Sequence, residues 1–357
     1  MKVILKKTEI FFKNFLLNLV LLFFRAKKRI DPVTINASQK VLIIRLNRVG
    51  DALITTPLIK LVKQNTGASV YVLADAKNRF AFSNNPFIDE VIIYRKGFSG
   101  FRKLVKNINS KKFDLVIDSH DDVSFTVTML VGMIKAPAKA ALKKKNSAIF
   151  THTIEKPDPR NTHVLLRVAA IAGALGIKYN PDELKVVVTV PETSNEEMKS
   201  ILRKRYPEKK LLLGINISAG SDARFWGVEN FKRLGKWIKE NFDVNLLFTC
   251  SPRDLKLALQ ISSDSDTVFD VPKFDEYTAL IKNLDLLFSP DTATVHVASA
   301  FSLPVFGLYV HYNTTDMIWS PYSSEFDGII TTEPNFQSVT FEEVINKFKP
   351  FLEKYLK

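Results

Sequence analysis

The stretch VLIIRLNRVGDALITTPLIKLV (residues 41–62) decides the fold of the first half of the chain. Its first residues are continuously apolar, Arg48 to Gly50 form a short predicted loop, and the apolar pattern after Asp51 is helical. A buried strand followed at once by a helix begins a βα unit of a parallel sheet that is covered on both faces. Asp51 therefore lies at the carboxyl end of a strand, where it either caps a helix or takes a proton from a ligand.

Pro57 bears on the choice between these roles. If a regular helix began at Asp51, the Pro57 ring would clash with the carbonyl four residues earlier. Thr56 and Pro57 are a better N-cap and first residue. We therefore expect residues 51–55 to form a distorted first turn that leaves Asp51 free for a role other than capping, and Gly50 to let the backbone turn tightly. The residues alone leave a structural role for Asp51 as the main alternative.

The same alternation of apolar strands and helices continues along the chain. We expect an α/β protein with two Rossmann-like doubly wound parallel sheets facing a cleft, with ligands bound at the carboxyl ends of the strands. A polar segment at 188–197 is expected to link the halves, and the last helix, from Phe341, to pack on either of them. Strands are predicted at residues 40–46, 69–74, 90–94, 113–119, 211–218, 244–250, 285–289 and 304–310. The predicted parts are a basic amphipathic helix and linker (1–37), a first domain (38–190), a second domain (191–335) and a C-terminal helix (336–357).

Composition excludes several classes of protein. The single cysteine, Cys250, excludes a disulfide framework and a cysteine-based metal site, and we expect it to be a buried strand residue. None of the 13 glycines forms G-x-G-x-x-G, and no P-loop is present. The five histidines lack metal-ligand spacing, and the DSD at 264–266 is typical of a solvated loop, so we predict neither a metal nor a cofactor. The net charge of +14 indicates an anionic partner, but no nucleic-acid motif is present and no nucleic acid is expected.

The N-terminal segment carries half of the excess charge. Residues 1–29 hold eight basic residues and one acidic residue, a net charge of +7, around the apolar run IFFKNFLLNLVLLFF (10–24). Fifteen residues are fewer than the roughly 20 that span a bilayer. The basic and asparagine side chains fall on one helical stripe, which is typical of a helix that lies in the interface of an anionic membrane. A signal peptide, a spanning helix and a plainly packed helix are the alternatives.

One strand-to-helix turn in the second half has the pattern of an anion site. In SPDTATVHVASA (289–300) a predicted strand ends and Asp291 and Thr292 begin a helix. The free amide groups and dipole of a helix N-terminus favour an anion such as diphosphate. Helix capping is the alternative for Asp291, and a core position is the alternative for His296.

A second turn repeats this chemistry. In INISAGSDARFWG (215–227) a strand ends in the small residues Ser218, Gly220 and Ser221, which suit phosphate oxygens. Arg224 follows and adds a permanent positive charge with bidentate donors. An exposed loop arginine is the alternative, but two such turns in one domain would together neutralise a leaving nucleoside diphosphate.

The sequence resembles glycosyltransferase family 9, the lipopolysaccharide heptosyltransferases. The resemblance spans about residues 40–350. It is carried by RLNRVGDALITTPLIKLV (45–62), GSDARFWGVENFKRL (220–234) and SPDTATVHVASAFSLPVFGLY (289–309), and more weakly by HVLLRVAAIAGALGI (163–177) and SVTFEEVINKF (338–348). It implies a GT-B fold in which the first domain binds the acceptor and the second binds the nucleotide sugar. It also implies metal-free inversion at the anomeric carbon, with ADP-heptose as the usual donor.

The resemblance implies a role for individual positions. Asp51 matches the general base that takes the proton of the acceptor hydroxyl while ADP leaves. Arg224 stands where the family often has a lysine, and Ala293 replaces the glycine of the D-T-G-x-x-H signature that holds the donor phosphates. Asp254 matches an acidic residue that binds the donor ribose, and Lys273 lies near the nucleotide-contacting loop. The residues assigned to the donor are Ser218, Gly220, Ser221, Arg224, Asp254, Lys273, Asp291, Thr292, Ala293 and His296.

The acceptor site is less defined by the sequence. Arg48, Gly50 and His120 are assigned to it. The basic candidates at predicted strand ends or loops of the first domain are Arg48, Lys77, Arg79, His120 and the lysine run at 143–145, and Arg48 and His120 rank above that run. The loop DSHDDVSF (118–125) lacks the Gln-Gly that the family usually has there, so this loop does not identify the acceptor.

The predicted function is transfer of a heptose from ADP-heptose to an inner-core acceptor, lipid A–Kdo or heptose, by a peripheral enzyme on the cytoplasmic face of the inner membrane. The membrane contact is assigned to residues 1–29, and the oligomeric state is left open. Two alternatives remain. One is another GT-B enzyme, either a UDP-sugar transferase or an epimerase. The other is a non-catalytic membrane-attached module that binds nucleotide sugar or nucleic acid.

Overall fold

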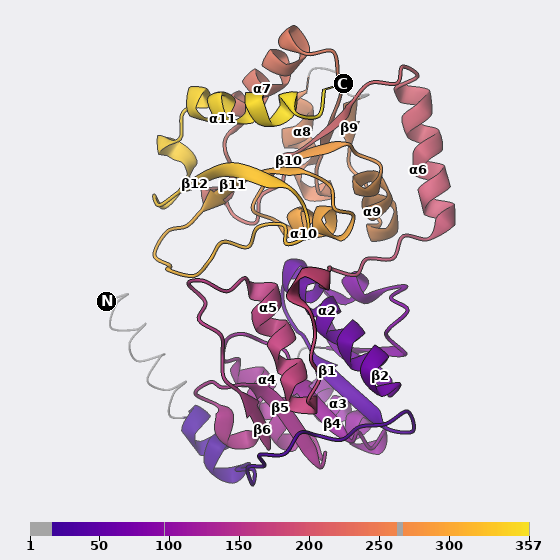
Figure 1. Ribbon diagram of the computed structural model, residues 1–357, viewed down its shortest axis with the longest axis vertical. Helices are drawn as coiled ribbons and strands as arrows, with labels where there is room; N and C mark the ends of the chain where they lie inside the picture. The colour runs from indigo at the N-terminus through magenta and orange to yellow at the C-terminus, as the bar shows by residue number, and fades with distance from the viewer. Residues whose placement is uncertain (1–15, 96, 263–266, 357) are drawn as a thin grey trace. The chain divides into compact units, whose positions relative to one another are not determined.

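The computed structural model of the protein describes residues 16–95, 97–262 and 267–356. The chain divides into two compact units, Met1–Glu183 and Leu184–Lys357 (Figure 1). Each unit is a parallel sheet with helices packed on it, and the predicted two Rossmann-like sheets of an α/β fold are confirmed.

The first unit has a six-stranded, all-parallel sheet in the order β3-β2-β1-β4-β5-β6. The winding reverses between β1 and β4, so the carboxyl ends of these two strands form the topological switch point, where open α/β sheets bind ligands. Apart from Lys40 and Asp118 at their ends, both strands are apolar, and both are almost completely buried, as a central parallel strand requires. The strands are β1 Lys40–Ile44, β2 Ser69–Asp75, β3 Glu90–Tyr94, β4 Leu115–Asp118, β5 Ala138–Leu142 and β6 His152–Ile154.

The helices of the first unit connect these strands. A helix at residues 16–23 precedes the sheet. The others are α2 Val49–Thr66, α3 Phe98–Ser110, α4 Phe125–Met133 and α5 Val164–Ala169, with short 3₁₀ helices η1 Arg79–Phe82, η2 Ser147–Ile149, η3 Ala170–Leu175 and η4 Pro181–Glu183. Within the described part of the chain, no helix combines the length and the apolar character needed to cross a membrane.

Helix α2 corrects the prediction that a regular helix starts at Pro57, with Thr56 as its N-cap, after a distorted turn at 51–55. It begins at Val49 and contains Pro57. Proline removes the amide that would bond to the Leu53 carbonyl. The Thr56 hydroxyl donates to that carbonyl instead, at 2.7 Å. The neighbouring side chain therefore satisfies the group that proline leaves without an amide partner, and the helix continues through this position.

The second unit repeats the same winding. Its parallel sheet has the order β12-β11-β10-β7-β8-β9, with the switch point between β7 and β10. In both sheets the first strand is central, the next two lie on one side and the last three on the other. The strands are β7 Leu212–Asn216, β8 Asn245–Thr249, β9 Val268–Phe269, β10 Leu286–Pro290, β11 Val305–Val310 and β12 Phe326–Thr331.

Six α-helices lie in the described residues of the second unit. They are α6 Glu192–Arg205, α7 Val228–Asn241, α8 Leu255–Ile261, α9 Phe274–Lys282, α10 Ala293–Ala300 and α11 Phe341–Glu353, with 3₁₀ helices η5 Asp222–Arg224, η6 Pro252–Asp254 and η8 Phe336–Ser338. Because α6 begins at Glu192, the prediction of a polar linker across 188–197 is wrong for its second half. Helix α11 packs on the second unit, where Phe348 joins the core.

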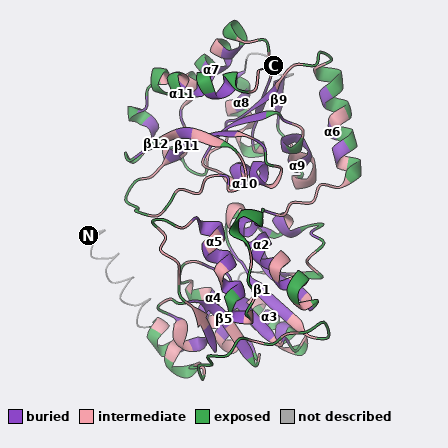
Figure 2. Ribbon diagram, in the orientation of Figure 1, coloured by how far each residue is buried: buried purple, intermediate pink, exposed green. Residues whose placement is uncertain are grey.

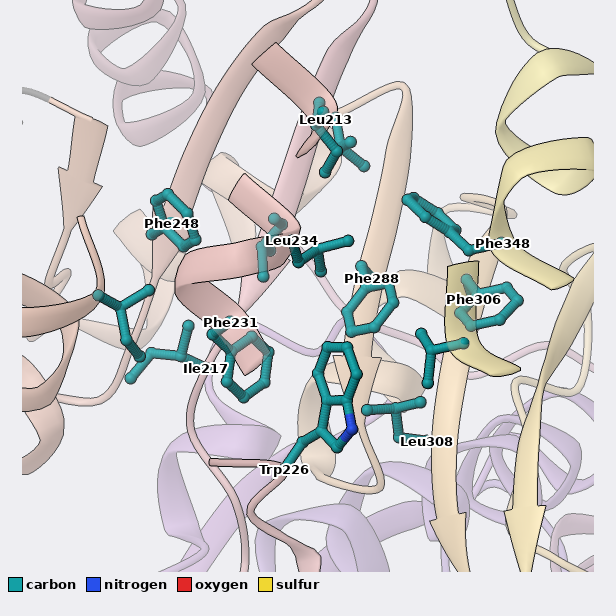
Figure 3. Close-up of a cluster of buried hydrophobic side chains, with 14 of the residues drawn as sticks. Leu213, Ile217, Trp226, Phe231, Leu234, Phe248, Phe288, Phe306, Leu308 and Phe348 are labelled. Atoms are coloured by element: carbon teal, nitrogen blue, oxygen red, sulfur yellow. The ribbon is translucent and has the colours of Figure 1, made fainter. Parts of the chain in front are cut away.

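Aromatic side chains dominate the core of the second unit, and buried residues line its sheet (Figures 2 and 3). The Phe288 ring lies 5.4 Å from Phe306 and 5.2 Å from Phe348, centroid to centroid. Trp226 packs edge-on against Phe231 at 5.5 Å. The Trp226 side chain therefore anchors the loop that carries Arg224, two residues earlier, to the core of the unit.

Candidate functional site

Asp51 lies at the switch point of the first unit, as the third residue of α2. The N-cap of this helix is Arg48, whose side chain makes no capping hydrogen bond. The Asp51 Oδ1 atom accepts a hydrogen bond from Arg45 Nη2 at 2.5 Å. The Asp51 side chain is 18% exposed and that of Arg45 is 2% exposed. The carboxylate is therefore held by a buried guanidinium and still reaches solvent, and Asp51 is not the N-cap of the helix.

Arg45 connects three strand ends of the first unit. Its Nη1 atom donates to the Ser119 carbonyl, just after β4. Its own carbonyl accepts from Asn78 Nδ2 at 3.0 Å, in the loop after β2. Sequence reasoning missed this residue because it was read as part of the strand 40–46. A single cation at the end of an otherwise apolar strand was the signal that could have identified it.

A second buried network lies behind this loop. Asp118 Oδ1 accepts from His120 Nδ1 at 2.7 Å, and Asp118 Oδ2 accepts from Lys144 Nζ at 2.8 Å. The Leu46 amide donates to His120 Nε2 at 3.2 Å, so Nδ1 is the ring nitrogen that carries the proton. Burial alone would raise the pKa of Asp118, but the Lys144 charge and the His120 hydrogen bond outweigh it and hold that pKa well below its usual range.

In this network His120 and Lys144 bind groups inside the first unit. Both ring nitrogens of His120 have partners inside the first unit, so its ring ties the loop after β4 to the loop after β1. Lys144 is the buried member of the 143–145 run, with a side chain 4% exposed, whereas Lys143 pairs with Glu155 on the surface.

The loop between β1 and α2 turns at a different residue from the one predicted. Asn47 has a φ of 87°, in the left-handed region that asparagine tolerates, and its amide donates to Asp75 Oδ2 at 3.1 Å. Gly50 is the second residue of α2 and is not among the residues with positive φ, so the interpretation that it forms a tight turn is wrong. Arg48 is exposed beside it.

In the second unit, Asn216 joins the two strand ends of the switch point. Its Nδ2 atom lies 2.9 Å from Ser289 Oγ, 3.1 Å from Thr292 Oγ1 and 3.4 Å from Thr294 Oγ1. Its Oδ1 atom accepts from the Ser218 amide at 3.1 Å. One buried amide side chain therefore brings together the two turns that the sequence singled out separately. Sequence reasoning gave Asn216 no role.

Arg224 and Asp291 form an ion pair at this switch point. Arg224 Nη1 lies 3.0 Å from Asp291 Oδ2 and donates to the Asp291 carbonyl at 3.3 Å. A Cβ added at Gly220 would lie 3.6 Å from the same nitrogen, so the small-residue turn lies beside the guanidinium. The structure therefore brings Gly220, Arg224 and Asp291 together.

Helix α10 begins next to this ion pair. Thr292 is its N-cap and makes no side-chain capping bond, and Ala293 is its first residue. The first amides of a helix have no carbonyl within the helix to bond to, and they carry partial positive charge. An anion at this end would meet these amides together with the Arg224 guanidinium. His296, in contrast, is buried one turn into the helix, with its ring centroid 6.3 Å from that of Trp319.

Asp254 lies beside Ser218 at the end of β8. Its Oδ2 atom accepts from Ser218 Oγ at 2.6 Å and from Ser251 Oγ at 2.7 Å. Arg253 Nη2 donates to the Ala219 carbonyl at 2.9 Å and fixes the adjoining backbone. The carboxylate is thereby oriented next to the turn that follows β7.

Two predicted donor residues, Lys273 and Ser221, take no part in the side-chain hydrogen bonds described above for Asn216, Arg224 and Asp254. Lys273 is the N-cap residue of α9, is largely exposed and pairs with Glu276, whose hydrogen bond raises the pKa of Lys273. Ser221 is exposed, with extended backbone before η5. Cys250 is buried just after β8, as predicted, and burial raises the pKa of its thiol to about 12.

In ranges 16–95, 97–262 and 267–356, no three His, Cys, Asp or Glu side chains are grouped so that they could hold an ion. The DSD of residues 264–266 lies outside the described residues.

Comparison with known proteins decides the family. The family model for glycosyltransferase family 9 (heptosyltransferase) matches residues 101–348. The chain belongs to glycosyltransferase family 9. This family 9 chain is a glycosyltransferase, and its two sheets form a GT-B fold.

Relatives of this family 9 protein match it over most of its length. It is 24% identical over 318 residues to the lipopolysaccharide core heptosyltransferase OpsX of Haemophilus influenzae, covering 86% of this chain and 88% of that protein. A crystal structure of a family 9 glycosyl transferase from Veillonella parvula matches with a TM-score of 0.74 and 18% identity, covering 90% of this chain and 99% of the other. The ADP-heptose lipopolysaccharide heptosyltransferase II of Escherichia coli matches with a TM-score of 0.70 and 18% identity, covering 88% and 99%.

Proposed function

We propose that the protein transfers a heptose from ADP-heptose to an inner-core lipopolysaccharide acceptor, lipid A–Kdo or heptose, with inversion and without a metal. The observation that carries this proposal is the Asp51 carboxylate, held by buried Arg45 at the switch point of a family 9 chain. Relatives whose names include lipopolysaccharide core heptosyltransferase support the choice of substrates. We assign acceptor binding to residues 38–190 and donor binding to residues 191–335.

The donor diphosphate is assigned to the turn that contains Arg224 and to the N-terminus of α10. A guanidinium and free amides are suited to a dianion whose charge grows as the sugar leaves. Asp291 orients Arg224 through the 3.0 Å ion pair. The assigned phosphate environment also includes the small residues Ser218, Gly220 and Ser221 of the turn after β7. On the side of α10 it includes Thr292, Ala293 and His296.

The nucleoside is assigned to Asp254, with Lys273 at its edge. Two serine hydroxyls already orient Asp254 Oδ2. A carboxylate has about four lone-pair sites, so Asp254 retains capacity to accept hydrogen bonds from ribose hydroxyls.

The chemical step is a single displacement. The acceptor hydroxyl oxygen bonds to the anomeric carbon from the face opposite the diphosphate. The bond from that carbon to the diphosphate oxygen breaks, and its electron pair leaves with ADP. The hydroxyl proton passes to Asp51, whose second carboxylate oxygen is available while Oδ1 remains bonded to Arg45. Arg48, Gly50 and His120 are assigned to the acceptor side, with the His120 ring holding the two loops in place.

The experiment that tests this function pairs nucleotide binding with product analysis. We expect ADP, and not UDP or GDP, to raise the melting temperature, and we expect ADP-heptose with the inner-core acceptor to give a product of inverted anomeric configuration by NMR. Stabilisation by UDP alone would contradict the heptose proposal and favour a different nucleotide sugar. Retained anomeric configuration would contradict the single displacement.

The site of action is proposed to be the cytoplasmic face of the inner membrane, with residues 1–29 contacting anionic lipid. The charge of this segment supports the proposal, since it holds eight basic residues and one acidic residue. A lipid-linked acceptor would be within reach of an enzyme bound there.

A further inference from the structure

The helix at residues 16–23 is fixed to the first unit by one of its faces. Val20 is buried, and Leu21 and Phe24 pack on the core of that unit. A Cβ added at Gly132 in α4 would lie 2.7 Å from the Phe24 ring, so Gly132 provides the space that the ring occupies. These positions are spaced as one helical face.

The opposite face of this helix is also apolar. Leu22 is 77% exposed and Phe23 is 79% exposed, and Leu16 and Leu19 are exposed beside them. A helix that packs on a soluble domain normally presents polar side chains to water on its outer face. A contiguous exposed apolar face of this kind marks an interaction site.

Cations lie directly next to the apolar face. A cavity of about 620 Å³ is lined by Arg25, Lys27 and Lys28 together with Leu21 and Leu22. Lys28 Nζ donates to the Ser147 carbonyl at 2.7 Å, which fixes one of these cations in place. Burial, and to a smaller extent the charge of neighbouring Lys143, lowers the pKa of Lys28.

The segment is attached rigidly at its far end as well. The Ala26 amide donates to the Ala148 carbonyl at 2.8 Å, and the Arg29 amide donates to the Thr151 carbonyl at 2.9 Å. Both acceptors belong to the first unit. The exposed face therefore moves with the first unit and is not joined to it by a flexible linker.

We propose that this leader face, formed by Leu19, Leu22 and Phe23 with Arg25, Lys27 and Lys28, docks the first unit on an anionic lipid bilayer. The apolar side chains enter the interface, and lipid phosphates bind in the basic cavity. A second copy of the chain fits the face poorly, because a two-fold contact would bring the same cations together. The inference deepens the proposed function, in which the acceptor is lipid-linked, by naming the residues and the lipid charge that hold the enzyme there.

Flotation of the full-length protein with lipid vesicles tests the inference. We expect binding to vesicles of phosphatidylcholine with phosphatidylglycerol and little binding to phosphatidylcholine alone. Replacing Arg25 and Lys27 with Gln removes two cations, each worth about fivefold in partitioning, so binding should fall about 25-fold. Replacing Leu22 and Phe23 with Ser should reduce binding at least tenfold.

Matched controls change the second unit in the same way. Lys236→Gln with Lys239→Gln removes two cations from α7, and Leu259→Ser changes an exposed leucine of α8. Neither control should alter vesicle binding, and circular dichroism should show that every variant is folded. Leader variants should keep wild-type turnover on an acceptor presented in detergent, so loss of turnover there would concern the proposed function and not the docking.

Three outcomes would overturn the docking proposal. The first is equal binding to neutral and anionic vesicles. The second is unchanged binding in both leader variants. The third is a wild-type protein that binds no vesicles and sediments as a dimer, while the variant with Leu22→Ser and Phe23→Ser sediments as a monomer. This result would assign the face to a second copy of the chain.

Discussion

Replacing Asp51 should separate activity from stability in a way that only a catalytic base would produce. Asp51→Asn keeps an oxygen that can accept from Arg45 Nη2, whereas Asp51→Ala removes it. Neither side chain can take a proton from an acceptor hydroxyl. We therefore expect kcat to fall by about 10²–10⁴-fold in both variants, the range that proton transfer to a positioned base contributes.

The stability effects of the two variants should differ. In Asp51→Asn the hydrogen bond keeps its ionised Arg45 donor but loses the negative charge of the acceptor, which costs about 1 kcal/mol in the free energy of unfolding. In Asp51→Ala the Arg45 guanidinium, 2% exposed, loses its carboxylate partner, which costs about 3 kcal/mol. Arg45→Met should cost a similar amount and lower kcat by about 10–100-fold, because the base is then misplaced. Combining Arg45→Met with Asp51→Asn should lower kcat no further than Asp51→Asn alone.

The assays are single-turnover kinetics with saturating donor and urea unfolding at pH 7. Asp89→Asn is the matched control, because Asp89 is an ion-paired carboxylate of the same unit, bound to Lys63 on the surface. It should leave kcat unchanged. Near wild-type kcat in Asp51→Asn together with loss of kcat in Asp51→Ala would refute the assignment, because activity would then follow the structural bond to Arg45.

Three further predictions concern other groups. Arg224→Gln should lower kcat by about 10²–10³-fold by removing charge stabilisation of the leaving diphosphate, as measured with donor and acceptor saturating. Asp254→Asn should weaken ADP binding about tenfold in calorimetry and make it insensitive to removal of the ribose 2′-hydroxyl, since the lost hydrogen bond is the same. Lys144→Met should cost about 3 kcal/mol at pH 7. The pKa of Asp118 is lowered in the folded state, so its stabilisation is present above about pH 4 and is lost below it; the Lys144→Met penalty, measured by urea unfolding, should therefore shrink at about pH 3.

Most of the sheet structure was predictable because central parallel strands are continuous apolar runs. All eight predicted strands are present, with ends that differ by at most two residues. Strands β5, β6, β9 and β12 were missed. Strand β5 has the sequence AKAAL, and alanine has low strand propensity. Strands β6 and β9 have only three and two residues, and β12 contains an Asp-Gly pair.

The start of α2 could not be predicted from the local sequence pattern. The destabilisation that a proline causes inside a helix depends on a neighbouring side chain, which the pattern does not reveal. Propensity treats Pro57 as a helix breaker. The cost depends on what satisfies the Leu53 carbonyl, and here the Thr56 hydroxyl does so. The prediction for Gly50 was wrong for a related reason. The tight turn was assigned to this residue because it is a glycine, but Asn47 is the residue that adopts a positive φ.

The residues that connect the candidate site were the hardest to predict. Arg45 bonds to Ser119, 74 residues away, and Asn216 bonds to Ser289, 73 residues away. Motif spacing records only neighbours in sequence, so it singled out the turns but not the side chains that join them. The winding of the sheet supplies this information, because it places the ends of non-consecutive strands side by side at the switch point.

In the proposed mechanism, the bonds of Asp51 also constrain when the proton can move. A carboxylate is a far weaker base than an alkoxide, so Asp51 cannot remove a proton from a free acceptor hydroxyl in advance. The hydroxyl becomes acidic only as its oxygen bonds to the anomeric carbon, and the transfer must then be brief and well aimed. Arg45 is suited to this requirement because it fixes Oδ1 from a buried position and leaves the carboxylate partly exposed. In the proposed mechanism, the first unit contributes precise placement of the base more than its strength, and Arg45→Met measures that contribution directly.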